Sequence, residues 1–145
     1  MHTQARYFIR TALISLVAAF CVGALVLVNQ GLALDQRIGA LLPVFYHLLM
    51  VGWATQMICG VALWMFPPYS RERPRGDERL GWFTYGALNT GLLLRAIFEP
   101  LHAWLPPGFG WPLVLSALLQ VLASWAFVIG IWPRVKARPT RRPTT

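Results

Sequence analysis

Apolar residues dominate four stretches of the chain, and short polar segments separate them. The stretches cover residues 11–30, 43–66, 80–99 and 113–132. Each is close to the roughly 20 residues that an α-helix needs to cross a bilayer. A buried helix of a soluble protein would be shorter and would show a polar face. The pattern therefore predicts an all-α fold, an integral membrane four-helix bundle whose helices run up and down.

The ends of these stretches carry recognisable signals. The second stretch has no charged residue and stops at Pro67 and Pro68, because proline donates no backbone hydrogen bond and restricts the residue before it. The first stretch follows Arg6 and Arg10 and resembles a signal peptide in its basic start. Its apolar run is too long for a signal peptide, so a retained membrane helix is predicted.

Composition agrees with this class of protein. Of the 145 residues, 57% are hydrophobic and 12% are charged, whereas a soluble domain would carry about twice that share of charge. The prediction is one membrane domain over residues 1–145, with the lipid bilayer as its main partner. The net charge of +8 does not indicate nucleic-acid binding, because the basic residues lie in short segments between the apolar stretches.

The distribution of basic residues predicts the orientation. They precede the first stretch, separate the second from the third, and follow the fourth; on the opposite side the connecting segments contain Arg37 alone. Basic segments stay on the cytoplasmic side, so both termini are expected to be cytoplasmic in a multi-pass protein of a bacterial-type inner (plasma) membrane. The basic, proline-rich tail over residues 133–145 is predicted to be disordered.

A few polar residues interrupt the apolar stretches near the predicted outer face. His47 lies about one turn inside the second stretch, while Arg95 and Glu99 are spaced i,i+4 near the end of the third. Ionisable residues at membrane depth are functional candidates, and pairing lowers their cost. His102 lies at a similar depth. Pro100 leaves two possibilities open: the third helix kinks and continues to His102, or it stops and His102 lies in an interfacial turn.

Two histidines at one depth on neighbouring helices fit axial ligation of a haem. The expected cofactor-binding residues are His47, His102 and Arg95, with the two imidazoles as metal ligands and Arg95 beside the haem propionates. The expected cofactor is a b-type haem, and copper is the less favoured alternative. The competing interpretation is structural: a membrane histidine can simply hydrogen-bond a neighbouring helix, and Arg95 with Glu99 can be an ion pair that supports the fold.

A second polar pattern indicates close packing between helices. Gly52, Gln56 and Gly60 are spaced i, i+4, i+8, and Asn89 lies inside the third stretch. Small residues at this spacing let helices approach, and an amide side chain can hydrogen-bond across the contact. On an ideal helix this face points away from His47, so the two features are expected to serve different neighbours.

Two segments resemble a known family. The run Tyr46-His47-Leu48-Leu49-Met50-Val51-Gly52-Trp53 resembles the H-L-x-x-x-G-W signature of relatives of haem–copper oxidase subunit I. Residues 88–95, LNTGLLLR, are similar to the N-x-x-x-L-L-R segment of NnrS-type haem–copper membrane proteins. In these families histidines hold haem or copper. The resemblance matches His47 to the family histidine and Arg95 to the family arginine, and places Phe45 where many relatives carry a second histidine.

The resemblance implies a reduced, four-helix relative, since family members have about a dozen helices. The leading hypothesis is a small respiratory-type protein that binds haem and takes part in electron transfer or in handling nitric oxide or oxygen. No catalytic residue is predicted, which favours a role other than that of a stand-alone enzyme. The alternative is a cofactor-free structural or assembly subunit, docked through the Gly52/Gln56/Gly60 face to a second copy or to a larger respiratory complex. A small transporter is less favoured, because no stretch is interrupted at mid-membrane.

Overall fold

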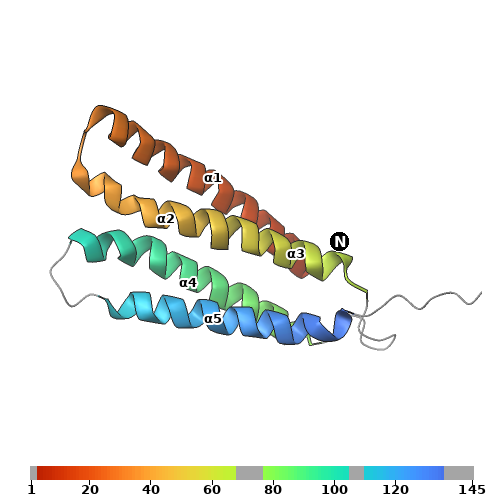
Figure 1. Cartoon of the computed structure of the whole chain (residues 1–145). Helices are drawn as coiled ribbons and strands as arrows, with labels where there is room; N and C mark the ends of the chain where they lie inside the picture. Colours follow the sequence, from red (N-terminus) through yellow and green to blue (C-terminus); the bar gives the residue numbers. More distant parts are fainter. Residues whose placement is uncertain (1–2, 68–76, 105–109, 136–145) are drawn as a thin grey trace, which may run out of the picture.

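Two helical hairpins lie side by side in the computed structural model, which describes residues 3–67, 77–104 and 110–135 (Figure 1). The described residues contain helices and no strand, which confirms the all-α prediction. The first hairpin consists of α1 (Thr3–Leu32), a 3₁₀ turn η1 (Gln36–Leu41), and a long second helix made of α2 (Leu42–His47), the π-helical segment η2 (Leu48–Thr55) and α3 (Gln56–Met65). The second hairpin consists of α4 (Glu78–Trp104), α5 (Trp111–Ile131) and the short 3₁₀ turn η3 (Trp132–Arg134).

Three of these helical stretches are long and apolar enough to cross a membrane. They cover Thr3–Leu32, Gln36–Met65 and Trp111–Arg134. Helix α4 has a similar length to its neighbours but is more polar, because Asn89, Arg95, Glu99 and two threonines interrupt its apolar run. The structure thus supports a membrane protein with four long helices in the described part of the chain. Because α4 is the most polar of the four helices, its polar side chains have to be covered by the other three.

The helix boundaries settle the alternatives at Pro100. Helix α4 continues through Pro100 and ends at Trp104, so His102 lies on the helix and not in an interfacial turn. Helix α1 begins at Thr3 rather than at residue 11. The prediction of a disordered tail from residue 133 was wrong at its first residues, because η3 is helical and Arg134 is only 7% exposed. Residues 136–145 of that tail lie outside the described residues.

Small residues let α1 pack closely on the second helix of its hairpin. The buried residues of α1 recur at intervals of three and four, which makes a single stripe: Ala5, Phe8, Ala12, Ser15, Ala19 and Val26. Gly60 of α3 and Gly52 of η2 fit against this stripe. Without a hydrophobic force between helices in lipid, such close backbone approach provides much of the attraction through van der Waals contact.

The second hairpin is built in the same way. Gly91 of α4 lies against the backbone of α5, where a Cβ atom would come within 3.0 Å of the carbonyl oxygen of Ser116. Ala87, Leu88 and Ala123 form a buried apolar cluster between α4 and α5. The Ser116 hydroxyl donates a 2.6 Å hydrogen bond to the carbonyl of Gly91 and adds a polar link to this contact.

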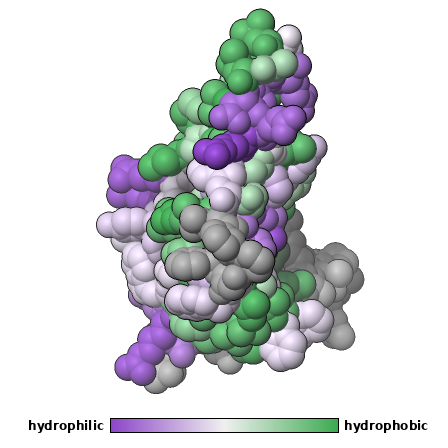
Figure 2. Space-filling model, turned by 90° about the vertical axis from the view of Figure 1, so that its left-hand side faces the viewer, coloured by the Kyte–Doolittle hydropathy of each residue, from purple (hydrophilic) through white to green (hydrophobic). Residues whose placement is uncertain are grey.

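Many large apolar side chains are exposed on the outside of the bundle. Exposed residues of this kind occur on every long helix, among them Ile14, Val17, Phe20, Ile58, Leu93, Trp125 and Ile129. In water such a surface would aggregate, whereas in a bilayer it is the lipid-facing side. The end of the bundle that carries η1 is different, because hydrophilic residues lie beside apolar ones there (Figure 2). That mixture is expected where a bundle leaves the apolar part of a membrane.

Candidate functional site

The π-helical segment η2 decides which side chains of the second helix face α4. It covers eight residues directly after His47, and the Thr55 hydroxyl donates a 2.8 Å bond to the carbonyl of Met50, five residues earlier. On an uninterrupted α-helix His47 and Gln56 would point to roughly opposite sides, at about 100° per residue. A π turn holds more residues than an α turn, so two such turns rotate the following segment. Both side chains consequently face α4, and the expectation that they serve different neighbours was wrong for Gln56.

His47 is held by its own helix and by α4. Its Nδ1 atom lies 2.8 Å from the carbonyl oxygen of Pro43, one turn earlier, and 3.6 Å from the Oε2 atom of Glu99. A carbonyl oxygen can only accept, so Nδ1 carries the proton in this hydrogen bond. In the neutral ring Nε2 then keeps its lone pair. Nε2 takes part in neither contact, and the side chain is 26% exposed.

Glu99 joins His47 to Arg95. The Nη2 atom of Arg95 donates to the Oε1 atom of Glu99 over 3.3 Å, with the i,i+4 spacing that the sequence predicts for an ion pair. The second carboxylate oxygen, Oε2, and the Nε atom of Arg95 are buried and make no hydrogen bond within the described structure. The three side chains therefore form a charged cluster at the η1 end of the contact between the hairpins. We call it the His47–Glu99–Arg95 cluster.

His102 and His47 contact different groups. Its side chain is exposed, and its Cε1 atom lies on the side of Gly110, where a Cβ would approach it to 3.8 Å. The imidazole of His47 instead faces a carboxylate. Among the described residues no three His, Cys, Asp or Glu side chains come together as a metal site. The donor set does not fit a copper ion held by this chain alone, whereas one imidazole with a free Nε2 fits a single axial ligand of a haem.

An amide pair lies deeper in the same contact. The side chain of Gln56 is fully buried and exchanges hydrogen bonds with Asn89, at 3.0 Å from its Nε2 to Oδ1 and 3.3 Å from Nδ2 of Asn89 to its Oε1. Asn89 also donates to the carbonyl of Tyr85 over 2.8 Å. Both amides are thus satisfied by protein groups, which is what buried polar groups in lipid require. The sequence predicted the polar packing role of these two residues but not that they bind each other.

Gln56→Leu is expected to destabilise the bundle by about 1–2 kcal/mol. The substitution leaves the amide of Asn89 with one backbone partner in place of three hydrogen bonds, and interhelical bonds in membranes are each worth about 0.6–2 kcal/mol. Unfolding in detergent with increasing sodium dodecyl sulfate, followed by circular dichroism, measures the change. The double variant Gln56→Leu, Asn89→Leu is expected to recover part of the loss, since it leaves no unpaired amide. If the double variant instead loses as much stability as the two single variants together, the amide pair does not couple the helices.

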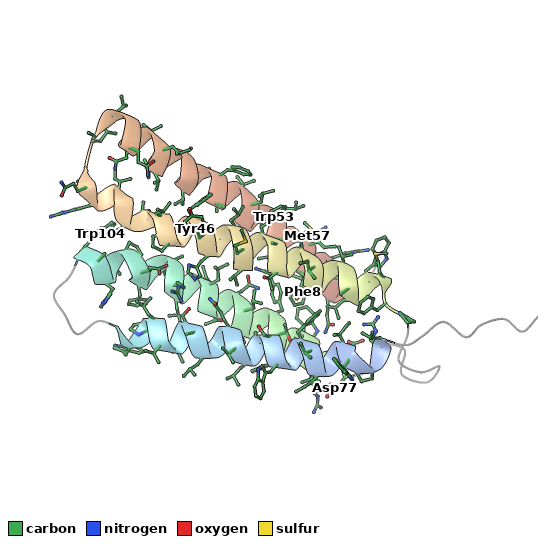
Figure 3. The ribbon with its side chains drawn as sticks, viewed as in Figure 1. Phe8, Tyr46, Trp53, Met57, Asp77 and Trp104 are labelled. Carbon is green, nitrogen blue, oxygen red and sulfur yellow. The ribbon has the colours of Figure 1, made fainter. Side chains whose placement is uncertain are left out.

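Further polar contacts join the two hairpins from end to end. At the end opposite η1, the Gln4 amide donates to the carbonyl of Glu78 over 2.7 Å, and the Thr11 and Tyr85 hydroxyls lie 2.8 Å apart. At the η1 end, the indole Nε1 of Trp104 donates to the carbonyl of Arg37 over 3.2 Å. Figure 3 shows Trp104 at the tip of α4, beside the turn between α1 and α2. We call this series, with the amide pair and the charged cluster, the inter-hairpin seam.

The last link of the seam is Arg134, which closes the end of α3. Its guanidinium donates to the carbonyl oxygens of Leu63, Phe66 and Pro67 over 3.2, 2.8 and 3.0 Å. The last carbonyls of a helix have no partner within the helix, and a positive charge there also interacts favourably with the helix dipole. Sequence reasoning assigned Arg134 to the topology signal only. A single arginine directly after an apolar stretch could not be distinguished from its basic neighbours.

The Gly52/Gln56/Gly60 face lies inside the helical bundle rather than on its surface. A Cβ at Gly52 would lie 2.8 Å from the Cβ of Ser15 in α1, and one at Gly60 would lie 2.8 Å from Cγ1 of Ile9. Gly52 and Gly60 therefore support close packing, as predicted, but their neighbour is α1. The hypothesis that this face docks a second copy or a larger complex is wrong, because α1 and α4 already cover it.

Comparisons of the chain with protein-family models, curated proteins and solved structures gave no match. The resemblance to haem–copper oxidase subunit I and NnrS-type proteins therefore stays a prediction. The fold and the site define the class: a small membrane protein whose described residues form two helical hairpins, joined by polar side chains, with the His47–Glu99–Arg95 cluster at one end of the contact.

Proposed function

We propose that this chain is a small respiratory-type membrane protein that binds one b-type haem through Nε2 of His47. The role that follows from a haem at this place is electron transfer or the handling of nitric oxide or oxygen. The proposed setting is the inner membrane of a bacterial-type cell, with both termini cytoplasmic and the η1 end outside. The basic residues between the spans support this orientation through the positive-inside rule.

The observation that carries the proposal is the hydrogen bond from Nδ1 of His47 to the carbonyl of Pro43. Histidines that bind a metal usually donate their other ring nitrogen to a carbonyl or a carboxylate, which fixes both the tautomer and the ring orientation. His47 has a carbonyl at 2.8 Å and a carboxylate at 3.6 Å from the same nitrogen. Because Nδ1 is the donor in this hydrogen bond, Nε2 is the ring nitrogen that could bind iron.

The other two residues that the sequence predicts to bind haem, Arg95 and His102, have smaller parts in this proposal. Arg95 binds Glu99, so its support for a negatively charged propionate would have to be shared with that carboxylate. His102 is exposed at the start of the last turn of α4 and belongs to a different neighbourhood from His47. A second axial ligand, if the iron has one, is therefore proposed to come from a second copy or from a partner subunit of a respiratory complex.

His47→Ala is expected to abolish haem binding while His102→Ala keeps most of it. The measurement is an absorption spectrum of detergent-purified protein, oxidised and dithionite-reduced, after expression with added haem precursor. A haem signal in the wild type that disappears in His47→Ala and persists in His102→Ala supports the proposal. Wild-type protein without a haem signal, after expression with adequate haem supply, would refute it.

A cofactor-free structural or assembly subunit is the second candidate. The contact between His47 and Glu99 favours it, because that contact already gives the imidazole a role as a link between the hairpins. On this hypothesis all spectra are featureless, and His47→Ala lowers stability by about 1 kcal/mol or less, the usual value of one membrane hydrogen bond or exposed ion pair. The same set of purified variants thus distinguishes the two candidates.

A further inference from the structure

We propose that Glu99 is a positioning residue for the iron ligand His47, and that Arg95 limits its effect. The inference rests on the proposed haem binding and goes beyond it, since it assigns a task to the two charged residues. In this arrangement Glu99 makes the imidazole of His47 a stronger electron donor, and Arg95 neutralises part of the carboxylate charge. The reduction potential of the haem then depends on both residues, with opposite signs.

The geometry of Glu99 is unusual for a simple ion pair. One oxygen, Oε1, binds Arg95, while Oε2 points towards Nδ1 of His47 at 3.6 Å and has no hydrogen-bond partner within the described structure. The side chain is 15% exposed. A buried carboxylate oxygen without a partner is costly. The donor nearest to Oε2 is Nδ1–H of His47, which hydrogen-bonds the carbonyl of Pro43 at 2.8 Å and lies 3.6 Å from Oε2. The cost is understandable if Glu99 shares this proton more strongly when the site is in use.

A haem iron held by Nε2 of His47 would supply that change. It would withdraw electron density from the ring, so the proton on Nδ1 would become a better hydrogen-bond donor. A carboxylate acceptor then returns electron density to the ligand, as the outer partners of metal-bound histidines do. An electron-rich imidazole stabilises ferric iron over ferrous iron. Removing the charge of Glu99 is therefore expected to raise the reduction potential, and removing the charge of Arg95 is expected to lower it.

The surroundings contain few other charges that could produce the same effect. Around the cluster, α4 contributes Arg95 itself, and η1 with its preceding turn contributes Arg37 and Asp35. The halves of α1 and α5 at this end of the bundle carry no Asp, Glu, Lys or Arg. In this apolar setting the effective dielectric constant is lower than in water, so a neighbouring charge acts more strongly. Glu99 lies 3.6 Å from His47, and Arg95 is paired with Glu99.

The test is a redox titration of the purified haem protein in wild type, Glu99→Gln, Arg95→Gln and Glu78→Gln. Glu99→Gln is expected to raise the midpoint potential so that the ferric-to-ferrous ratio at fixed potential falls about three- to tenfold; a tenfold change in a one-electron couple equals 59 mV. Arg95→Gln is expected to shift the potential the other way. Glu78→Gln removes the same charge from the opposite end of α4 and is expected to leave the potential unchanged.

Each outcome of this titration decides something. Equal potentials in wild type, Glu99→Gln and Arg95→Gln, with haem bound in all, overturn the role of Glu99 and leave haem binding by His47 intact. A shift of similar size in Glu78→Gln also overturns it, because the effect would then reflect total charge. If the Glu99→Gln protein does not accumulate, the midpoint potential of Arg95→Gln tests the inference alone. An Arg95→Gln potential above that of the wild type would contradict it. Wild-type protein without haem refutes both this inference and the proposed function.

Discussion

Gly60→Leu is expected to lower the free energy of unfolding by about 3 kcal/mol, which is the upper end of the usual range for overpacked sites. The reason is the lack of space between α3 and α1. A Cβ at this position would lie 2.8 Å from Cγ1 of Ile9, 3.1 Å from the Cβ of Phe8 and 3.2 Å from the carbonyl oxygen of Ala5. The isobutyl group of leucine can be accommodated only if the two helices move apart, and that separation also loses the contacts of the buried stripe on α1.

The measurement is unfolding by sodium dodecyl sulfate in detergent micelles, followed by tryptophan fluorescence. Gly86→Leu is the matched control, because Gly86 lies inside α4 and, among the described residues, no atom outside its own helix neighbourhood comes within 4 Å of a Cβ built there. Leucine has the higher helix propensity, so this control is expected to be neutral or slightly stabilising. If the Gly60→Leu protein is as stable as the control but differs in oligomeric state, the Gly52/Gln56/Gly60 face binds another protein chain rather than α1.

The helices themselves were predictable because they rest on a strong signal. Four apolar stretches of membrane length, separated by polar segments, define the two hairpins, and the structure reproduces them with shifts of a few residues at most ends. The i,i+4 pair of Arg95 and Glu99 was also predictable, since both residues lie on one helix and ideal geometry brings them together. Contacts within one regular element follow from spacing alone.

The partners across the seam were not predictable, because they depend on rotation of the helices. The π-helical segment has no sequence signal strong enough to be recognised among apolar residues, yet it brings His47 and Gln56 to the same neighbour. Ideal α-helical geometry predicted the opposite. The same limit explains why Glu99 rather than His102 faces His47. Depth in the membrane follows from the sequence, whereas ideal geometry gives the direction of a side chain correctly only where the helix is regular.

The seam also gives the charged cluster its physical setting. Polar contacts recur along the whole contact between the hairpins, from Gln4 at one end to Trp104 at the other. Such contacts fix the relative position of two hairpins that otherwise meet through apolar surfaces of low specificity. His47 on the first hairpin and Glu99 on the second are therefore held at a defined separation. This is the requirement for a ligand whose outer partner comes from another helix.

Arg134→Met is expected to lower the free energy of unfolding by about 2 kcal/mol, the second large effect. Arg134 donates to the carbonyl oxygens of Leu63, Phe66 and Pro67, and hydrogen bonds from a charged group contribute about 1.5–3 kcal/mol. Methionine preserves much of the apolar length of the side chain but leaves the three carbonyls at the end of α3 without this donor. Partial hydration near the edge of the bundle keeps the loss below the sum of three bonds.

Two further variants separate the capping contacts of Arg134 from its charge. Arg134→Lys keeps the charge but has a single nitrogen, which cannot reproduce the spread of contacts made by a guanidinium, so an intermediate loss of about 1 kcal/mol is expected. Arg10→Met removes a charge from an exposed residue near the same end of the bundle and is expected to leave stability within about 0.5 kcal/mol of wild type. If Arg134→Met and Arg10→Met lose the same stability, net charge rather than the helix end explains the effect. A larger loss for Arg134→Met than for Arg134→Lys identifies Arg134 as the residue that joins α5 to the end of α3.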